Sequence, residues 1–94
     1  MSFPDAVEAK NITINSKTRL FDYSELRKRK IVSSSIGLEI CGDRALSSMY
    51  SGRSDVICCG LDKKERHFFE SKGYKVELQG YTDFFDFEYY KIGW

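Results

Sequence analysis

The chain has 94 residues, a formal net charge of +1, 41% hydrophobic residues and 31% charged residues. This balance predicts a globular chain with one domain over residues 1–94, rather than a disordered chain. A net charge so close to zero gives no electrostatic reason to expect a nucleic-acid partner. The longest apolar runs fall far below the roughly 20 residues of a membrane span. The opening MSFPDAVEAK lacks the charged and apolar regions of a signal peptide.

The segment SFPDAVEAKN, residues 2–11, predicts a short helix. Pro4 suits the first turn of a helix, and Asp5 and Glu8 favour its positive N-terminal end. The following TINSKTR, residues 13–19, is expected to be a connector.

Residues 22–52 show two apolar stripes when they are placed at 100° per residue. This pattern predicts one long helix with a capping box from Asp22 to Glu25 and an end at Gly52. One stripe should face the core, and the first helix or a second subunit should cover the other. That second stripe comprises Val32, Ile36, Ile40, Leu46 and Tyr50. Gly37 and Gly42 each cost about 1 kcal/mol inside a helix, so a break near residues 33–42 is the alternative.

The next segments predict a strand, a helix and a second strand. DVICCGL, residues 55–61, is a continuous apolar run that is typical of a strand buried on both faces. DKKERHFFESKGY predicts a helix with a capping box from Asp62 to Glu65, ended by Gly73, so that Tyr74 packs back on Phe69 or Phe68. YKVELQ alternates between apolar and polar residues and predicts a half-buried strand.

The closing segment YTDFFDFEYYKIGW, residues 81–94, predicts a last strand. Its apolar side switches between Tyr89 and Tyr90, which indicates either a β-bulge there or a central strand buried on both faces. The predicted fold class is therefore α+β, an α-α-β-α-β-β domain with a three-stranded mixed sheet packed against helices. The first two strands should run parallel and the last antiparallel, with the last strand or residues 55–61 in the centre. An apolar face left uncovered would predict a homo-oligomer.

The three cysteines, Cys41, Cys58 and Cys59, are expected to be reduced. Their number is odd, and adjacent cysteines rarely bridge each other because the ring is strained. Without a secretion signal, reduced thiols in a cytosol are the expectation. A zinc site with His67 is disfavoured because structural zinc sites present thiolates in C-x₂₋₄-C pairs. Small buried side chains are the preferred interpretation.

No catalytic constellation is evident. His67 is the only histidine, and nothing in the sequence places a partner or a cleft beside it. SGRSDVICCG lacks the Lys-Ser/Thr of a phosphate-binding loop. Asp83, Asp86 and Glu88 are expected to be the solvated face of an edge strand. The chain is therefore predicted to be no enzyme, with no catalytic, cofactor-binding or metal-binding residue and no cofactor.

Two segments are candidates for binding. The basic run Arg27, Lys28, Arg29 and Lys30 could grip the phosphates of a nucleotide or a nucleic acid, although four successive helical residues spread around the helix. The aromatic tail has acidic neighbours, which disfavour a phosphate ligand. A protein interface is the better functional alternative to a core role. The candidate interface residues are Tyr50, Tyr89, Tyr90 and Trp94.

The motifs GYKVEL and YYKIGW, with a capped helix before Gly73 and an aromatic strand ending at Trp94, resemble small proteins of tailed bacteriophages. The resemblance covers about residues 44–94 and transfers no site residue. It implies a phage origin. The leading hypothesis is a non-enzymatic accessory protein that binds a host protein or signal in the host cytoplasm, as an inhibitor of a host process or defence. The alternatives are a small virion component bound to capsid or tail, and a nucleotide or nucleic-acid binder.

Overall fold

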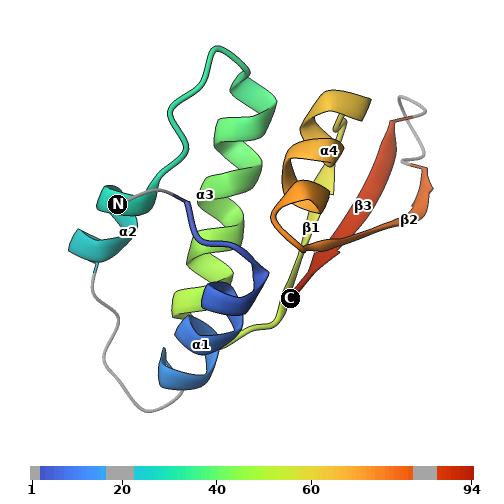
Figure 1. Cartoon of the computed structure of the whole chain (residues 1–94). Coiled ribbons are helices and arrows are strands. Elements are labelled where there is room, and N and C mark those ends of the chain that lie inside the picture. Colours follow the sequence, from blue (N-terminus) through green and yellow to red (C-terminus); the bar gives the residue numbers. More distant parts are fainter. Residues whose placement is uncertain (1–2, 17–22, 82–86) are drawn as a thin grey trace.

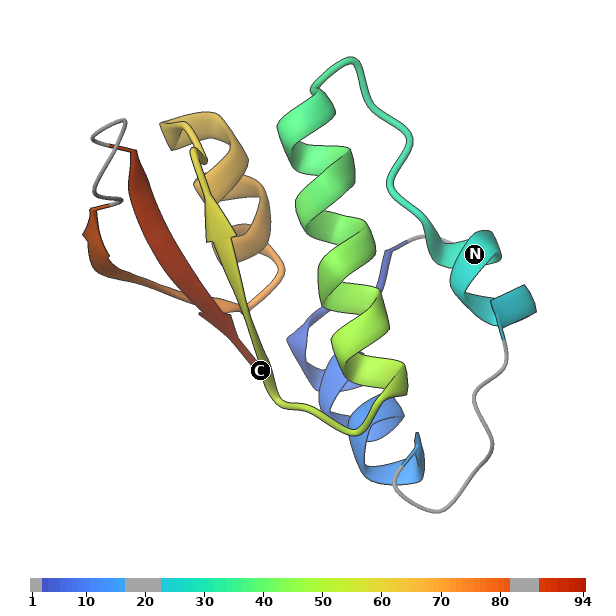
Figure 2. The same ribbon diagram turned by 180° about the vertical axis from the view of Figure 1, so that it is seen from behind.

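The computed structural model describes residues 3–16, 23–81 and 87–94, which form helices on one side of a three-stranded sheet (Figures 1 and 2). The predicted α+β class is confirmed. Three helices, not two, precede the first strand among these residues. The helices are α1 (Ala6–Ser16), α2 (Tyr23–Arg29), α3 (Ile36–Tyr50) and α4 (Lys63–Ser71), and the strands are β1 (Asp55–Cys59), β2 (Lys75–Tyr81) and β3 (Glu88–Gly93).

The sheet has the order β1-β3-β2, and β3 pairs antiparallel with both neighbours. β1 and β2 therefore run in the same direction, as expected, but β3 lies between them and no two described strands pair parallel. The central strand is the last one, which was one of the two predicted choices. The register shifts between Leu78 and Gly80, opposite Tyr89 and Tyr90. The expected irregularity is thus located in β2.

Side chains alternate across the sheet, and the described helices α1 to α4 cover one of its two faces. Val56 and Cys58 of β1 are buried with Ile92 of β3, whereas Ile57 and Cys59 are exposed on the outer face. The prediction that residues 55–61 form a strand buried on both faces is therefore wrong. The core joins this inner face to α3 and α4 through Leu46, Met49, Phe69 and Ile92, all fully buried.

The long helix expected over residues 22–52 is also wrong, because the chain leaves the helical path between α2 and α3. Ser35 caps α3 by accepting a hydrogen bond from the Leu38 N–H (3.2 Å), and the Ser33 N–H donates to Glu39 Oε1 (2.9 Å). Such local bonds compete with a continuous helix. The segment folds back so that Ile31 packs over Gly42, where a Cβ would lie 2.4 Å from Ile31 Cδ1. Asp22 lies outside the described residues.

Helix α4 follows its local signals as predicted. Asp62 and Glu65 form the capping box. Gly73 adopts a left-handed φ of +89°, which glycine tolerates without strain. The Tyr74 N–H donates to the Phe69 carbonyl (3.1 Å), and the two rings pack edge to face at 5.8 Å. The predicted packing of Tyr74 on Phe69 is confirmed.

Glu65 also connects α4 to α3. Its Oε2 accepts a hydrogen bond from the Ser35 hydroxyl (2.6 Å), and its Oε1 accepts one from the Asp62 N–H (2.9 Å). The residue is only 8% exposed. A Cβ on Gly37 would lie 2.5 Å from Glu65 Oε2. The carboxylate therefore sits at the N-terminal ends of both helices, where the helix dipoles favour negative charge.

Helix α1 begins after Asp5, whose Oδ1 accepts from the Glu8 N–H (2.8 Å), and it runs to Ser16. The predicted connector is therefore helical up to Ser16, and residues 17–19 lie outside the described ranges. Thr13 donates to the Arg53 carbonyl (2.9 Å) and accepts from the Trp94 indole N–H (2.7 Å). These bonds fix α1 against the end of the sheet. Among the described helices, none is long and apolar enough to cross a membrane.

Candidate functional site: the open edge of the sheet

Strand β1 forms an edge of the sheet, and the backbone groups on one side of it pair with no other described strand. The Trp94 N–H donates to the Ser54 carbonyl, and the Gly60 N–H donates to the Glu88 carbonyl, each at 3.0 Å. Bonding alternates along an antiparallel strand. Residues 56 and 58 therefore direct their backbone groups to β3, and residues 55, 57 and 59 direct theirs to the open edge.

A depression of about 430 Å³ lies between this edge and α3. It is lined from α3 by Asp43, Arg44, Ser47 and Ser48, and from the turn and β1 by Arg53, Asp55, Val56 and Ile57. We call it the α3–β1 groove. One wall is thus a helix and the other is the open edge of a strand.

Exposed aliphatic side chains continue the α3 wall toward the N-terminal end of the helix. Val32, Ile36 and Ile40 are 91%, 73% and 55% exposed. Ile36, Ile40 and Arg44 follow one another at intervals of four residues, so they share one flank of α3. The second apolar stripe of the sequence is therefore divided, because its other members, Leu46 and Tyr50, are buried. Of its exposed members, Ile36 and Ile40 share a flank of α3 with the groove residue Arg44, whereas Val32 precedes the helix.

The groove is lined by two arginines and two aspartates, and no described carboxylate pairs with either arginine. Its two acids are paired outside it, Asp43 with Lys30 (3.5 Å) and Asp55 with Lys91 (3.9 Å). Arg44 and Arg53 are exposed, and no carboxylate within residues 3–16, 23–81 and 87–94 forms an ion pair with either. Anionic groups on a ligand could form charge-assisted hydrogen bonds with both guanidinium groups.

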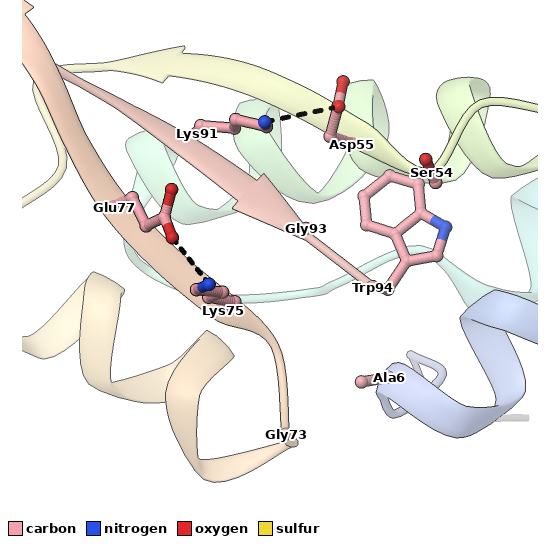
Figure 3. A pocket seen from close by; sticks show the side chains of 9 residues that line it. All are labelled: Ala6, Ser54, Asp55, Gly73, Lys75, Glu77, Lys91, Gly93 and Trp94. Carbon is pink, nitrogen blue, oxygen red and sulfur yellow. Dashed lines mark ion pairs between the residues drawn. The ribbon is translucent and has the colours of Figure 1, made fainter.

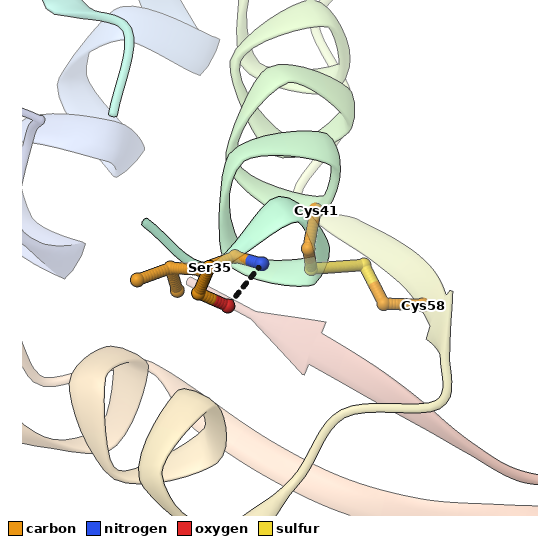
Figure 4. The surroundings of a disulfide bond; sticks show 4 residues. Ser35, Cys41 and Cys58 are labelled. Carbon is orange, nitrogen blue, oxygen red and sulfur yellow. Dashed lines mark hydrogen bonds between the residues drawn. A yellow bond between two sulfur atoms is a disulfide. The ribbon is translucent and has the colours of Figure 1, made fainter. Parts of the chain in front are cut away.

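A disulfide between Cys41 and Cys58 joins α3 to β1 (Figure 4). The expectation of three reduced thiols is therefore wrong. Cys41 lies on the core stripe of α3, and Cys58 lies on the inner face of β1, so the fold brings their Cα atoms to 5.9 Å. Both sulfurs are consequently unavailable as metal ligands. Cys59 points to the outer face and is exposed.

The outer face of the sheet carries a second hollow, of about 600 Å³, around Gly93 and Trp94 (Figure 3). Its charged side chains form two pairs, Lys75 with Glu77 (2.9 Å) and Lys91 with Asp55 (3.9 Å). The hydrogen bond between Lys75 and Glu77 raises the pKa of the lysine and lowers the pKa of the glutamate. Because each lysine has an acidic partner, this hollow presents no net charge to a ligand.

The basic segment over residues 27–30 does not form one surface, because two of its four cations are paired with acids of other helices. Arg29 pairs with Glu8 of α1 (2.5 Å) and Lys30 pairs with Asp43 of α3 (3.5 Å), while Arg27 and Lys28 are exposed on α2. Burial by itself would lower the pKa of Arg29. The hydrogen bond and the charge interaction with Glu8 outweigh this effect, so the net pKa is raised above its usual value. Two of the four cations therefore hold helices together.

The predicted interface residues are divided in the same way. Tyr50 and Tyr90 are buried in the core, whereas Tyr89 and Trp94 remain half-buried. The Tyr90 hydroxyl is bonded to Glu88 and to Arg66, and its hydrogen bond to Glu88 raises the pKa of the phenol.

Of the remaining candidates from the sequence, His67 is exposed on α4. Glu88 pairs with Arg66 (3.4 Å) and lies on the central strand β3, so its expected place on an edge strand is wrong. Asp83 and Asp86 lie outside the described residues. The groove residues Arg44, Arg53 and Ile57 were not predicted as a site. Their sequence neighbourhoods give no sign that β1 lies at the edge beside α3, because strand order is set by tertiary pairing.

No family model, no curated protein and no solved structure matches this chain. Its function is therefore inferred from the geometry, and the resemblance to small phage proteins stays a prediction.

Proposed function

We propose that this chain is a non-enzymatic protein-binding module and that its binding surface is the α3–β1 groove with the exposed aliphatic residues Ile36 and Ile40 of α3. The observation that carries the proposal is that exposed aliphatic side chains of α3 lie beside the unpaired backbone edge of β1. Exposed aliphatic side chains grouped together mark interaction sites. An uncovered strand edge is a template for pairing with another chain. A protein partner satisfies both at once.

The resemblance to small proteins of tailed phages supports a more specific form of this proposal. In that form the partner is a host protein, and the chain acts in the infected cell by occupying a surface of that protein, as an inhibitor of a host process or defence. Such an action requires no chemistry from the chain itself.

Affinity capture from infected host lysate tests the proposal when it is performed with paired variants. The wild-type chain should retain a host protein that the double variant Ile36→Gln/Ile40→Gln loses. The matched control is Val7→Gln/Ile14→Gln, which alters two aliphatic residues of α1 that are 71% and 56% exposed. This control should retain the partner. Equal retention by both double variants, or the absence of any specific partner, would refute the proposal.

The Cys41–Cys58 disulfide favours a second candidate, a small component of the virion. Disulfides persist in oxidising surroundings such as virion surfaces and are rare in a reducing cytosol. Mass spectrometry of purified virions separates the candidates, since a virion component must be present there in fixed stoichiometry. Absence from virions rejects this candidate.

A further inference from the structure

We propose that the ligand of the α3–β1 groove is an acidic, extended protein segment that pairs with β1 as a fourth strand and places carboxylates on Arg44 and Arg53. This inference rests on the proposed function, because it specifies the chemistry of the protein partner.

The backbone of β1 supplies the first recognition element. Residues 55, 57 and 59 direct N–H and C=O groups away from β3, so an incoming strand can exchange hydrogen bonds with alternate residues. No other described strand pairs with this side of β1, because β1 ends the sheet order β1-β3-β2. A partner must therefore be extended over about five residues to use the edge completely.

Charge in the groove supplies the second element. Arg44 approaches from α3 and Arg53 from the turn before β1, so both flank the path of an added strand. Each lacks a carboxylate partner among the described residues, whereas the groove acids Asp43 and Asp55 are already paired with Lys30 and Lys91. A guanidinium group binds carboxylate in a bidentate geometry. The two arginines are therefore available to acidic side chains. Each groove aspartate has one oxygen paired with a lysine, and the other oxygen of Asp43 is buried without a hydrogen-bond partner among the described residues.

Other occupants fit less well. A nucleic-acid strand could use the arginines, but it has no alternating N–H and C=O groups that match a strand edge. A second copy of this chain could pair its own β1 with the edge. However, the only acid in that strand is Asp55, which already pairs with Lys91, so the arginines would gain no carboxylate.

A library of random displayed peptides, selected on the immobilised wild-type protein, tests this specificity without knowledge of the natural partner. Enriched peptides should carry Asp or Glu at alternate positions. Their affinity should fall about tenfold or more for Arg44→Glu/Arg53→Glu. The control Lys63→Glu/Lys64→Glu reverses two exposed cations of α4 and should bind like the wild type. Enrichment of peptides without acids, or equal binding by the two charge-reversal variants, overturns the proposal.

Substitutions at Ile57 test the strand pairing. Ile57→Pro removes an N–H that faces the open edge and leaves the bonds of residues 56 and 58 to β3 in place. Ile57→Glu keeps the N–H and puts a negative charge beside the edge, which disfavours strand pairing and repels an acidic segment. Both should abolish peptide binding, and the glutamate variant serves if the proline variant does not fold. Unchanged binding by a folded variant rejects strand addition.

The outcomes also separate this inference from the proposed function. If capture of the host protein depends on Ile36 and Ile40 but not on the groove residues, the proposed function stands. The proposal of an acidic ligand that pairs with β1 is then rejected. Two results of a different kind would likewise overturn it. One is self-association of the wild type in sedimentation that Ile57→Glu removes, and the other is binding of single-stranded oligonucleotides that Arg44→Glu/Arg53→Glu removes.

Discussion

The Cys41–Cys58 disulfide should account for a large part of the stability of this domain. It joins residues 17 apart in the sequence. The loop-closure entropy removed from the unfolded chain by a loop of this length corresponds to about 3 kcal/mol at 25 °C. A domain of this size has a free energy of unfolding of about 5–10 kcal/mol, so the bond should provide about 30–60% of it. Cys41 and Cys58 are 3% and 2% exposed, and the reduced thiols would remain packed as small apolar groups.

Urea unfolding with and without a thiol reductant measures this contribution. The wild type should lose about 3 kcal/mol on reduction, and Cys41→Ala/Cys58→Ala should be destabilised similarly without responding to reductant. Cys59→Ala is the control, because Cys59 is exposed and outside the bond, and its unfolding midpoint should equal that of the wild type. If reductant leaves the wild-type midpoint unchanged while all thiols become reactive, the entropic reasoning is wrong.

The remaining predictions concern the helix junction, a buried phenol and the open edge. Glu65→Ala should lower the free energy of unfolding by about 3 kcal/mol, because two hydrogen bonds to a buried carboxylate are lost, whereas the exposed Glu70→Ala should change it by no more than about 0.5 kcal/mol. Thermal denaturation of both variants checks the difference. Burial, then the nearby Asp5, raises the pKa of Tyr74, whose hydroxyl donates to the Pro4 carbonyl (2.7 Å). The stabilisation is therefore complete below the unfolded-state value of about 10 and is lost as pH rises above it. Alkaline titration should show a weaker loss for Tyr74→Phe, and equal losses contradict this assignment. In the free protein, amide hydrogen exchange should be fast at Ile57 and Cys59 and slow at Val56 and Cys58, and protection of all four amides would mean that the β1 edge is covered.

Local signals in the sequence predicted the part of the fold around α4 correctly. The capping box, the glycine stop and the packing of Tyr74 on Phe69 each involve residues close in sequence, so the chain itself contains the needed information. The strand directions followed in turn, because a helix connecting two strands usually returns the second strand parallel to the first.

The predictions that were wrong concern features that depend on contacts between distant segments of the chain. The helical periodicity of residues 22–52 was real, but the packing of Ile31 over Gly42 and the bond between Ser35 and Glu65 end the helix before Ser35. The apolar run of β1 looked two-sided because the sequence does not reveal that the described helices leave the outer face of the sheet, with Ile57 and Cys59, uncovered. For the same reason, the pairing of Cys41 with Cys58 and the meeting of Arg44 with Arg53 could not be foreseen.

The contact between Glu65 and α3 restricts how this chain can vary. Three positions share one small volume, because the carboxylate bonds to Ser35 and leaves no space for a side chain at Gly37. A substitution at any one of them changes what the other two can be. Relatives of this protein should therefore exchange the triplet Ser35, Gly37 and Glu65 as a unit, for example with a shorter acid at 65 wherever 37 carries a methyl group. This linked variation would identify homologues even where the surface residues of the groove have changed with the partner.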